Sequence, residues 1–410
     1  MTQNVVLGLG GTVDYEIRWD SAVMDELVAA YGIRLEELSR TIPVQTERDL
    51  TVTLLAFLHD GVGGERFIAS SDVVEAFAAR FEKRVTLGGT PVRAALAMSK
   101  IGVPSTVHLV SIDDDVRRLL PADCRYVCSA ARDSTDPHLI VQFSQGDAVR
   151  LGDVVLRAPH PNRVIYTNDP PNTEMLLSDQ LGGLLDTADV FLVSGLNVMN
   201  DPSALEERLQ ELRRLIRRLA PGARVVYEDA GFHLPEFGDR VRDAMAATVD
   251  VYSLNEDEMQ AYLGRELDLL DAAEMEWALI RLRAVVPART LVVHTKYWSA
   301  AIGQDAAGFA ASLQGGITMA STRFCHGDDF TAADYQAVAQ MPANRAGAEF
   351  SVAIEERLGH LVRCLPALAL SPAVPTTIGL GDSFVGGFIA ALGSTEFTSD
   401  ATNVPVSSRA

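Results

Sequence analysis

Near its C-terminal end the sequence contains a glycine-rich segment that ends in a carboxylate. The segment reads Gly379-Leu380-Gly381-Asp382, and the residues after it predict a helix that begins at about Gly381 or Asp382. Glycines let a backbone turn tightly and aim its N–H groups at an anion, and a helix N-terminus attracts the same charge. Asp382 could then accept a proton from a hydroxyl while the amides hold phosphoryl charge. The structural alternative is that Asp382 only caps the last helix.

A second acidic segment, Asn255-Glu256-Asp257-Glu258, directly follows an expected strand. Asn255 followed three residues later by Glu258 is a capping box, which needs no function. The functional alternative is a carboxylate that positions Mg²⁺ largely through water. Hard oxygen ligands of this kind suit Mg²⁺ or Mn²⁺ better than zinc.

Three glycine-containing segments lie in the first quarter of the chain. Gly88-Gly89-Thr90-Pro91 opens an expected helix and either lets a ligand hydroxyl approach the backbone or simply turns the chain. Residues 10–14 follow the first expected strand and end in Asp14, whose carboxylate could accept two sugar hydroxyls. Residues 61–67 form a hinge or a turn, and on its own this segment gives no reason to select Glu65.

A fold must bring these segments together, and the pattern of apolar residues indicates which one. The chain alternates short apolar runs with amphipathic stretches. This alternation predicts strands joined by helices, most clearly a helix around Leu205–Leu219. Strand–helix repeats require crossover connections, so we expect an α/β fold with a mainly parallel sheet flanked by helices. Ligands bind such sheets beyond the carboxyl ends of the strands. The predicted strands are Val5–Leu9, Val103–Val110, Arg163–Thr167, Val190–Ser194, Arg224–Glu228, Val249–Leu254 and Thr290–Thr295.

Two stretches break this rhythm. Residues 15–85 hold mostly helical patterns, and residues 125–166 alternate polar and apolar side chains, as an antiparallel sheet with one wet face does. We interpret both as insertions that form one smaller, discontinuous α+β lid domain. The core domain then contains residues 1–14, 86–124 and 167–392, and we expect residues 393–410 to be a disordered tail.

Composition excludes several classes of protein. The 410 residues are 48% hydrophobic and 22% charged, which is typical of a globular chain and excludes general disorder. A net charge of −20 argues against a nucleic acid partner, because a negative surface repels phosphates. Cys124 and Cys128 are expected to be reduced thiols rather than metal ligands. No signal peptide or membrane-spanning run is evident, so the expectation is a cytoplasmic, soluble protein.

Taken together, the segments resemble one family, the ADP-dependent glucokinases and phosphofructokinases, a branch of the ribokinase-like fold. The similarity runs through roughly residues 5–392. The Glu65, Asn162-Arg163 and Ser194-Gly195-Leu196 segments point to the ADP-dependent branch, whereas the loop at 379–382 is shared by the wider superfamily. The further matching segments are residues 10–14, Gly88-Gly89, His138-Leu139-Ile140, Asn168-Asp169, Glu228, Leu254-Asn255-Glu256, Glu258 and His294-Thr295.

The resemblance implies a sugar kinase that transfers the β-phosphate of ADP to a sugar or sugar phosphate hydroxyl, with Mg²⁺ or Mn²⁺ as the metal. It implies that Asp382 is the base and that Gly379, Leu380 and Gly381 form the anion hole. Arg163 would reach the transferred phosphate. The implied acceptor residues are Asp14, Glu65, Gly88, Gly89 and Thr90, the implied nucleotide residues are His294, Thr295 and Asn255, and the implied metal residues are Glu228 and Glu258.

The chain departs from the family pattern in three places. Val226 stands where the family often has histidine, Thr90 where it usually has asparagine or glutamine, and Gly10 and Thr12 lie where its first-strand motif usually has asparagine. The changes in the sugar pocket alter hydrogen bonding, so neither glucose nor fructose 6-phosphate is assumed as acceptor.

Two other functions remain open from the sequence. One is an ATP-dependent sugar or nucleoside kinase with the ribokinase-like fold. The other is a non-catalytic sugar- or nucleotide-binding regulator, against which the intact Asp382 and Glu258 argue. The oligomeric state is not indicated.

Overall fold

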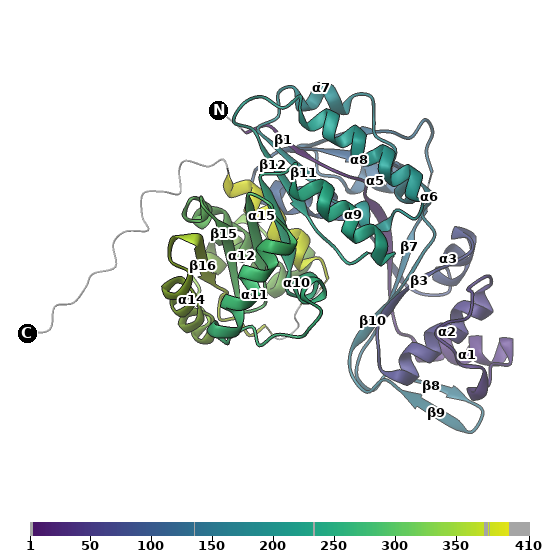
Figure 1. Cartoon of the computed structure of the whole chain (residues 1–410). Helices are drawn as coiled ribbons and strands as arrows, with labels where there is room; N and C mark the ends of the chain where they lie inside the picture. Colours follow the sequence, from purple (N-terminus) through teal and green to yellow (C-terminus); the bar gives the residue numbers. More distant parts are fainter. Residues whose placement is uncertain (1–2, 135, 233, 373–375, 377, 393–410) are drawn as a thin grey trace, which may run out of the picture.

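A larger α/β part and a smaller part that projects from it make up the molecule (Figure 1). This structure is a computed structural model, and it describes residues 3–134, 136–232, 234–372, 376 and 378–392. The expected tail at 393–410 therefore lies outside the described residues. No helix in these ranges is long and apolar enough to cross a membrane.

The larger part is built on a nine-stranded sheet. Seven neighbouring strands run parallel, and the last two strand pairings at one edge are antiparallel, so the predicted mainly parallel sheet is confirmed. The strands, in spatial order, are β16 (Val362–Pro366), β15 (Trp298–Gly303), β14 (Thr290–His294), β13 (Val251–Asn255), β12 (Arg224–Glu228), β11 (Val190–Val193), β1 (Val5–Leu7), β5 (Ser105–Leu109) and β6 (Cys124–Cys128).

Helices cover both faces of this sheet, which explains why its strands are almost entirely apolar. Alternate residues of β1 enter opposite cores: Val5 and Leu7 pack on one side and Val6 on the other. The first core also contains α4 (Thr90–Lys100), α12 (Ala310–His326) and α15 (Leu380–Leu392). The second contains α7 (Leu181–Leu185), α8 (Pro202–Ile216), α9 (Pro235–Ala246), α10 (Glu256–Leu263), α11 (Ala272–Val285) and α14 (Arg345–Leu358).

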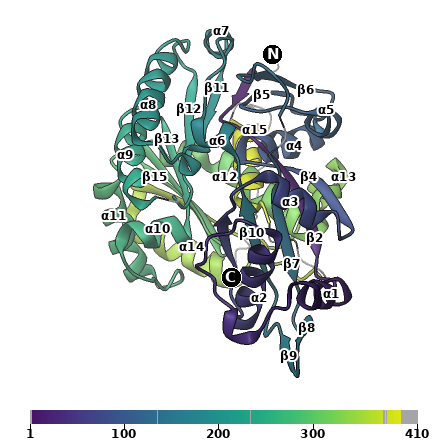
Figure 2. The same ribbon diagram turned by 90° about the vertical axis from the view of Figure 1, so that its right-hand side faces the viewer.

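The smaller part is built on a five-stranded mixed sheet that draws strands from both expected insertions. Its strands, in spatial order, are β3 (Gly64–Phe67), β10 (Asn162–Thr167), β7 (His138–Phe143), β2 (Thr12–Arg18) and β4 (Lys83–Gly88). Around it lie α1 (Ser21–Tyr31), α2 (Glu47–Asp60), α3 (Ser71–Ala78) and the hairpin of β8 (Ala148–Leu151) and β9 (Val154–Arg157) (Figure 2). The short helices α5 (Asp114–Leu119), α6 (Pro170–Glu174) and α13 (Ala332–Ala339) complete the α-helices of the described ranges.

Each expected boundary between core and lid falls inside a strand. The boundaries after residues 14, 85, 124 and 166 cut β2, β4, β6 and β10 respectively. In particular, residues 125–128 were expected in the lid but pair with β5 in the larger sheet. The reason is that β2, β4 and β10 belong wholly to the smaller sheet and β6 wholly to the larger one, and a shift in composition does not mark the end of a strand. A core and a lid stay our proposal, with their boundaries moved to strand ends.

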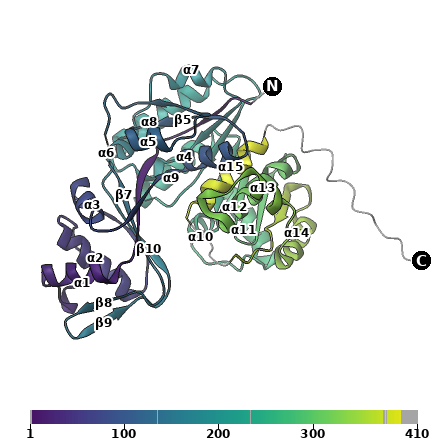
Figure 3. The same cartoon turned by 180° about the vertical axis from the view of Figure 1, so that it is seen from behind.

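Glycines allow α12 and α15 to pack with their backbones in contact (Figure 3). A Cβ on Gly315 would lie 2.5 Å from the carbonyl oxygen of Gly387, and a Cβ on Gly387 would collide with the carbonyl oxygen of Gly315. Neither helix can therefore carry a larger side chain there without moving. This contact sets the position of α15, whose first turn contains Asp382.

We expect Gly387→Ala to lower the free energy of unfolding by ~1–3 kcal/mol, since overpacking forces backbones apart. Gly183→Ala is the matched control, because Gly183 is also helical but a Cβ added to it would meet no atom within 4 Å. Urea denaturation of both variants measures the difference. Equal stability of the two would contradict tight packing between α12 and α15.

Candidate active site

A cleft of about 320 Å³ lies between the smaller sheet and the carboxyl ends of strands in the larger sheet. Leu9, Gly195 and Ala230, which follow β1, β11 and β12, line one side of it. The predicted site residues that line the cleft are Asp14, Glu65, Gly89, Thr90, Arg163, Gly379 and Asp382. The structure thus brings together the predicted acceptor residues, the base and the arginine from segments far apart in the chain.

The segment that contains Asp382 forms the first turn of α15. Gly379 has a φ of 67°, a left-handed conformation that favours glycine, and the helix begins directly after it at Leu380. This start is one or two residues earlier than predicted. Asp382 therefore lies inside the helix rather than at its N-cap, and its Oδ1 accepts a hydrogen bond from Thr90 Oγ1 at 2.8 Å. The first amides of a helix lack intrahelical partners and can bind an anion.

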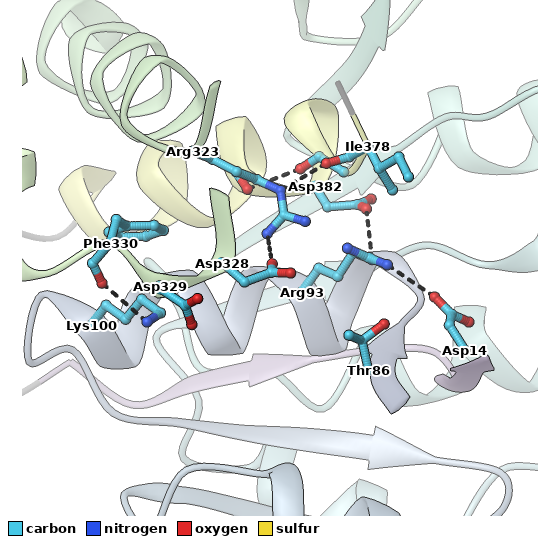
Figure 4. A network of polar contacts seen from close by, with 12 residues as sticks. Asp14, Thr86, Arg93, Lys100, Arg323, Asp328, Asp329, Phe330, Ile378 and Asp382 are labelled. Atoms are coloured by element: carbon cyan, nitrogen blue, oxygen red, sulfur yellow. Dashed lines mark hydrogen bonds and ion pairs between the residues drawn. The ribbon is translucent and has the colours of Figure 1, made fainter. Parts of the chain in front are cut away.

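Arg323 of α12 holds the residue before this turn. Its Nε donates to the carbonyl oxygen of Ile378 at 2.7 Å, and its Nη1 pairs with Asp328 (Figure 4). Arg84 of β4 lies 3.3 Å from the same aspartate. A chain of charged groups thus connects the smaller sheet to the residues directly before α15, the helix that contains Asp382.

Asp14 lies near the start of β2 and is 4% exposed. Its Oδ1 accepts a hydrogen bond from Thr12 Oγ1 at 2.7 Å, and its Oδ2 accepts one from Arg93 Nη2 at 2.9 Å. Gly88, its neighbour on β4, must lack a side chain because a Cβ there would collide with Thr12 and with both carboxylate oxygens of Asp14. Gly88 therefore supports the cleft without lining it.

Glu65 and Arg163 come from β3 and β10 at one edge of the smaller sheet. Glu65 is the register partner of Ile165, two residues from Arg163, and the three side chains line the cleft. Both residues thus line the same cleft as Asp382, and their expected roles toward the acceptor and the transferred phosphate stay predictions.

Three further residues that line the cleft, His138, Asp169 and Asn172, had no role assigned to them from the sequence. His138 Nε2 lies 3.0 Å from Asp169 Oδ2, and Asn172 Nδ2 donates to the same oxygen at 2.7 Å. Burial alone would lower the pKa of His138, but its hydrogen bond to Asp169 and nearby negative charges outweigh burial and raise it. His138 is the register partner of Asp14. Only strand pairing reveals this relationship.

Arg93 also lines the cleft without having been selected from the sequence. It lies on α4, three residues after Thr90, and this spacing places both side chains on one face of the helix. The three-residue spacing from Thr90 could have drawn attention to Arg93 in the sequence. It does not show what this face of the helix contacts.

Glu228, His294, Asn255 and Glu258 are not among the residues that line the cleft, and of these four His294 lies against the start of α15. His294 stacks on Phe384 with ring centroids 4.5 Å apart, and its Nε2 lies 2.9 Å from Glu228 Oε1. Burial would lower the pKa of His294, but the charge of Glu228 outweighs it and raises that pKa. The capping box is present, since Asn255 caps α10 and its N–H donates to Glu258 Oε2 at 2.8 Å. The structural interpretation, a capping box, and the functional one, a carboxylate that positions Mg²⁺, therefore both involve Glu258.

Thr295 has a structural role. Its Oγ1 accepts hydrogen bonds from the backbone N–H groups of Tyr297 and Trp298 and donates to the carbonyl oxygen of Trp298. The hydroxyl thus closes the turn between β14 and β15. Its expected contact with the nucleotide stays a prediction.

The donor groups around Glu228 fit a hydrated cation rather than a metal held by many side chains. Within the described ranges, no three His, Cys, Asp or Glu side chains are arranged to hold a metal ion. However, Glu228 Oε2 is buried without a hydrogen-bond partner there. Burial and the charge of Glu228 also raise the pKa of Glu258 to about 8. A cation that keeps part of its water shell would relieve both conditions.

Comparisons with known proteins agree with this geometry. A model of the family described as the ADP-specific phosphofructokinase/glucokinase conserved region matches residues 3–389. A search of curated protein sequences gave no match.

Among solved structures, the chain is similar to a phosphofructokinase from Pyrococcus horikoshii OT3 with AMP, at 17% identity and a TM-score of 0.80 over 95% of this chain and 97% of that one. It is also similar to the last common ancestor of ADP-dependent phosphofructokinases from Methanosarcinales, at 15% identity and a TM-score of 0.77 over 95% of this chain and 93% of that one. These identities support the shared fold. The family match over nearly the whole length shows that the chain belongs to the ADP-specific phosphofructokinase/glucokinase family and is an ADP-dependent sugar kinase.

Proposed function

We propose that this enzyme transfers the β-phosphoryl group of ADP to a hydroxyl of a sugar or sugar phosphate and releases AMP, with Asp382 as the base. The observation that carries the proposal is that Asp382 and Asp14 line one cleft at the first turn of α15. A carboxylate at an anion-binding helix start is the arrangement that phosphoryl transfer to a hydroxyl needs.

In this mechanism the acceptor hydroxyl gives its proton to Asp382, and its oxygen attacks the β-phosphorus. The bond from that phosphorus to the bridging oxygen breaks, and AMP leaves. The amides of Gly379, Leu380 and Gly381 stabilise the charge of the transferred group, and Arg163 approaches it from the smaller sheet. Thr90 orients the base through its hydrogen bond to Asp382 Oδ1.

The acceptor would be held by carboxylates and by the backbone. Asp14 and Glu65 accept hydrogen bonds from hydroxyls, and Gly89 and Thr90 allow the acceptor to approach α4. One structural neighbour is described as an ADP-dependent kinase complex with fructose-6-phosphate and ADPβS. We extend to this chain the acceptor class of a sugar or sugar phosphate.

Glu228 and Glu258 would hold Mg²⁺, or Mn²⁺, through its water shell, with His294 fixing Glu228. When bound, the cation supplies charge neutralisation for the phosphates of the nucleotide. Asn255 and His294 would lie beside that nucleotide.

We expect Asp382→Asn to lower kcat by roughly 10²-fold or more, the usual scale for loss of a general base. Binding of ADP, measured by calorimetry, should be retained because the helix amides remain. Glu207→Gln, which alters an exposed carboxylate on α8, is the control. A kcat near that of the wild type would remove Asp382 from the mechanism.

The nucleotide that the enzyme uses as phosphoryl donor distinguishes an ADP-dependent kinase from an ATP-dependent one. We expect kcat/KM with ADP to exceed that with ATP by at least ~10²-fold, since an extra phosphate displaces the reacting atom. We also expect Arg163→Ala to lower kcat more than ADP affinity, because charge moves in the transition state. Arg157→Ala, on the β8–β9 hairpin, is the matched control. Equal or better use of ATP would overturn ADP as the donor.

The metal is tested by its removal. We expect EDTA to abolish turnover and Mg²⁺ to restore it, since the phosphates need a counter-charge. Glu228→Gln and Glu258→Gln should raise the Mg²⁺ concentration needed for activity and reduce the Mg²⁺-dependent rise in Tm measured with ADP present. Activity that persists in EDTA, or an unchanged Tm response, would count against this site.

A further inference from the structure

Arg93 occupies a position in the cleft for which the mechanism above gives no role. Its side chain lines the cleft although it is only 5% exposed. Nη2 donates to Asp14 Oδ2 at 2.9 Å, and Nε lies 3.8 Å from Asp382 Oδ2 (Figure 4). One guanidinium therefore joins the carboxylate that would hold the acceptor to the carboxylate that would deprotonate it.

The surrounding backbone keeps this guanidinium in place. A Cβ on Gly379 would lie 3.0 Å from Arg93 Cδ and 3.1 Å from its Nη1, so the loop before α15 presses directly against the side chain. The other oxygen of Asp14 is occupied by the hydroxyl of Thr12. Arg93 thus has little freedom to turn away from either aspartate.

A positive charge is needed at this point because two carboxylates face the same small space. Like charges repel strongly where water is largely excluded, and a buried charge without a partner is costly. Without Arg93, the repulsion between Asp14 and Asp382 would turn the two side chains apart. A base that has turned away cannot take the proton of the acceptor hydroxyl.

We propose that Arg93 is a positioning residue that holds the side chains of Asp14 and Asp382 in the orientation in which both face one acceptor. This inference rests on the proposed function for the roles of the two aspartates. Lysine is not an equivalent, because an ammonium is a point charge and lacks the planar fork that reaches two carboxylates.

Kinetics of Arg93→Met and Arg93→Lys test this role. We expect both to lower kcat by ~10²-fold, the cost of misplacing reacting groups, and to raise the acceptor KM while the ADP KM stays unchanged. Free guanidinium at a non-denaturing concentration should restore part of the kcat of Arg93→Ala. Arg208→Met removes another buried arginine, which pairs with Glu211 on α8, and should leave all three constants unchanged.

A merely structural Arg93 would give a different result. Arg93→Met would then lower Tm while kcat and the acceptor KM of the folded fraction stayed at wild-type values, and this outcome would overturn the proposal. The double variant Arg93→Met/Asp14→Asn gives a second measurement that does not depend on turnover. It should be more stable to urea than Arg93→Met, because it lacks the unpaired buried charge.

Failure of this inference differs from failure of the proposed function. A wild-type enzyme that phosphorylates no sugar with ADP would overturn the proposed function. Normal kinetics in Arg93→Met, or a double variant no more stable than Arg93→Met, would overturn only the role of Arg93.

Discussion

The ion pairs of Arg93 with Asp14 and Asp382 are the interaction on which the cleft depends. The three residues come from α4, β2 and α15, so one guanidinium joins the larger sheet, the smaller sheet and the last helix of the described chain. Asp14 is buried, and a buried carboxylate without a partner is costly. The position of the two parts relative to each other and the geometry of the site thus share one electrostatic constraint.

Helix α12 supports the start of α15 and the residues directly before it. Its glycine contact with α15 sets the distance between the two helices, and Arg323 holds the carbonyl oxygen of Ile378. The glycine loop therefore gains its shape from tertiary contacts as much as from its own conformational freedom. A preorganised loop of this kind can stabilise developing charge without first rearranging.

The net charge of the chain does not describe the charge at the cleft. A chain with a formal charge of −20 belongs to a family that uses an anionic nucleotide. The lining of the cleft contains both signs of charge, because Arg93, Arg163 and His138 lie among the carboxylates of Asp14, Glu65, Asp169 and Asp382. Binding of a small anion follows the local field, whereas the overall charge governs encounters with large polyanions.

Local sequence patterns were enough to establish the α/β class and to select some of the segments that form the site, because the period of apolar residues, glycines and a carboxylate at a helix start are local signals. Glu65 and Arg163 were selected only through the resemblance to a family. The local patterns indicated Asp14, Thr90 and Asp382 as residues, but they could not show that the three meet. The folded chain was needed to show that His138 lies beside Asp14, through the register of β2 and β7, and that Arg93 lies between two aspartates. It was also needed to show that β2, β4, β6 and β10 cross the expected domain boundaries. Strand register and helix packing arise from contacts between distant residues, and no local pattern encodes them.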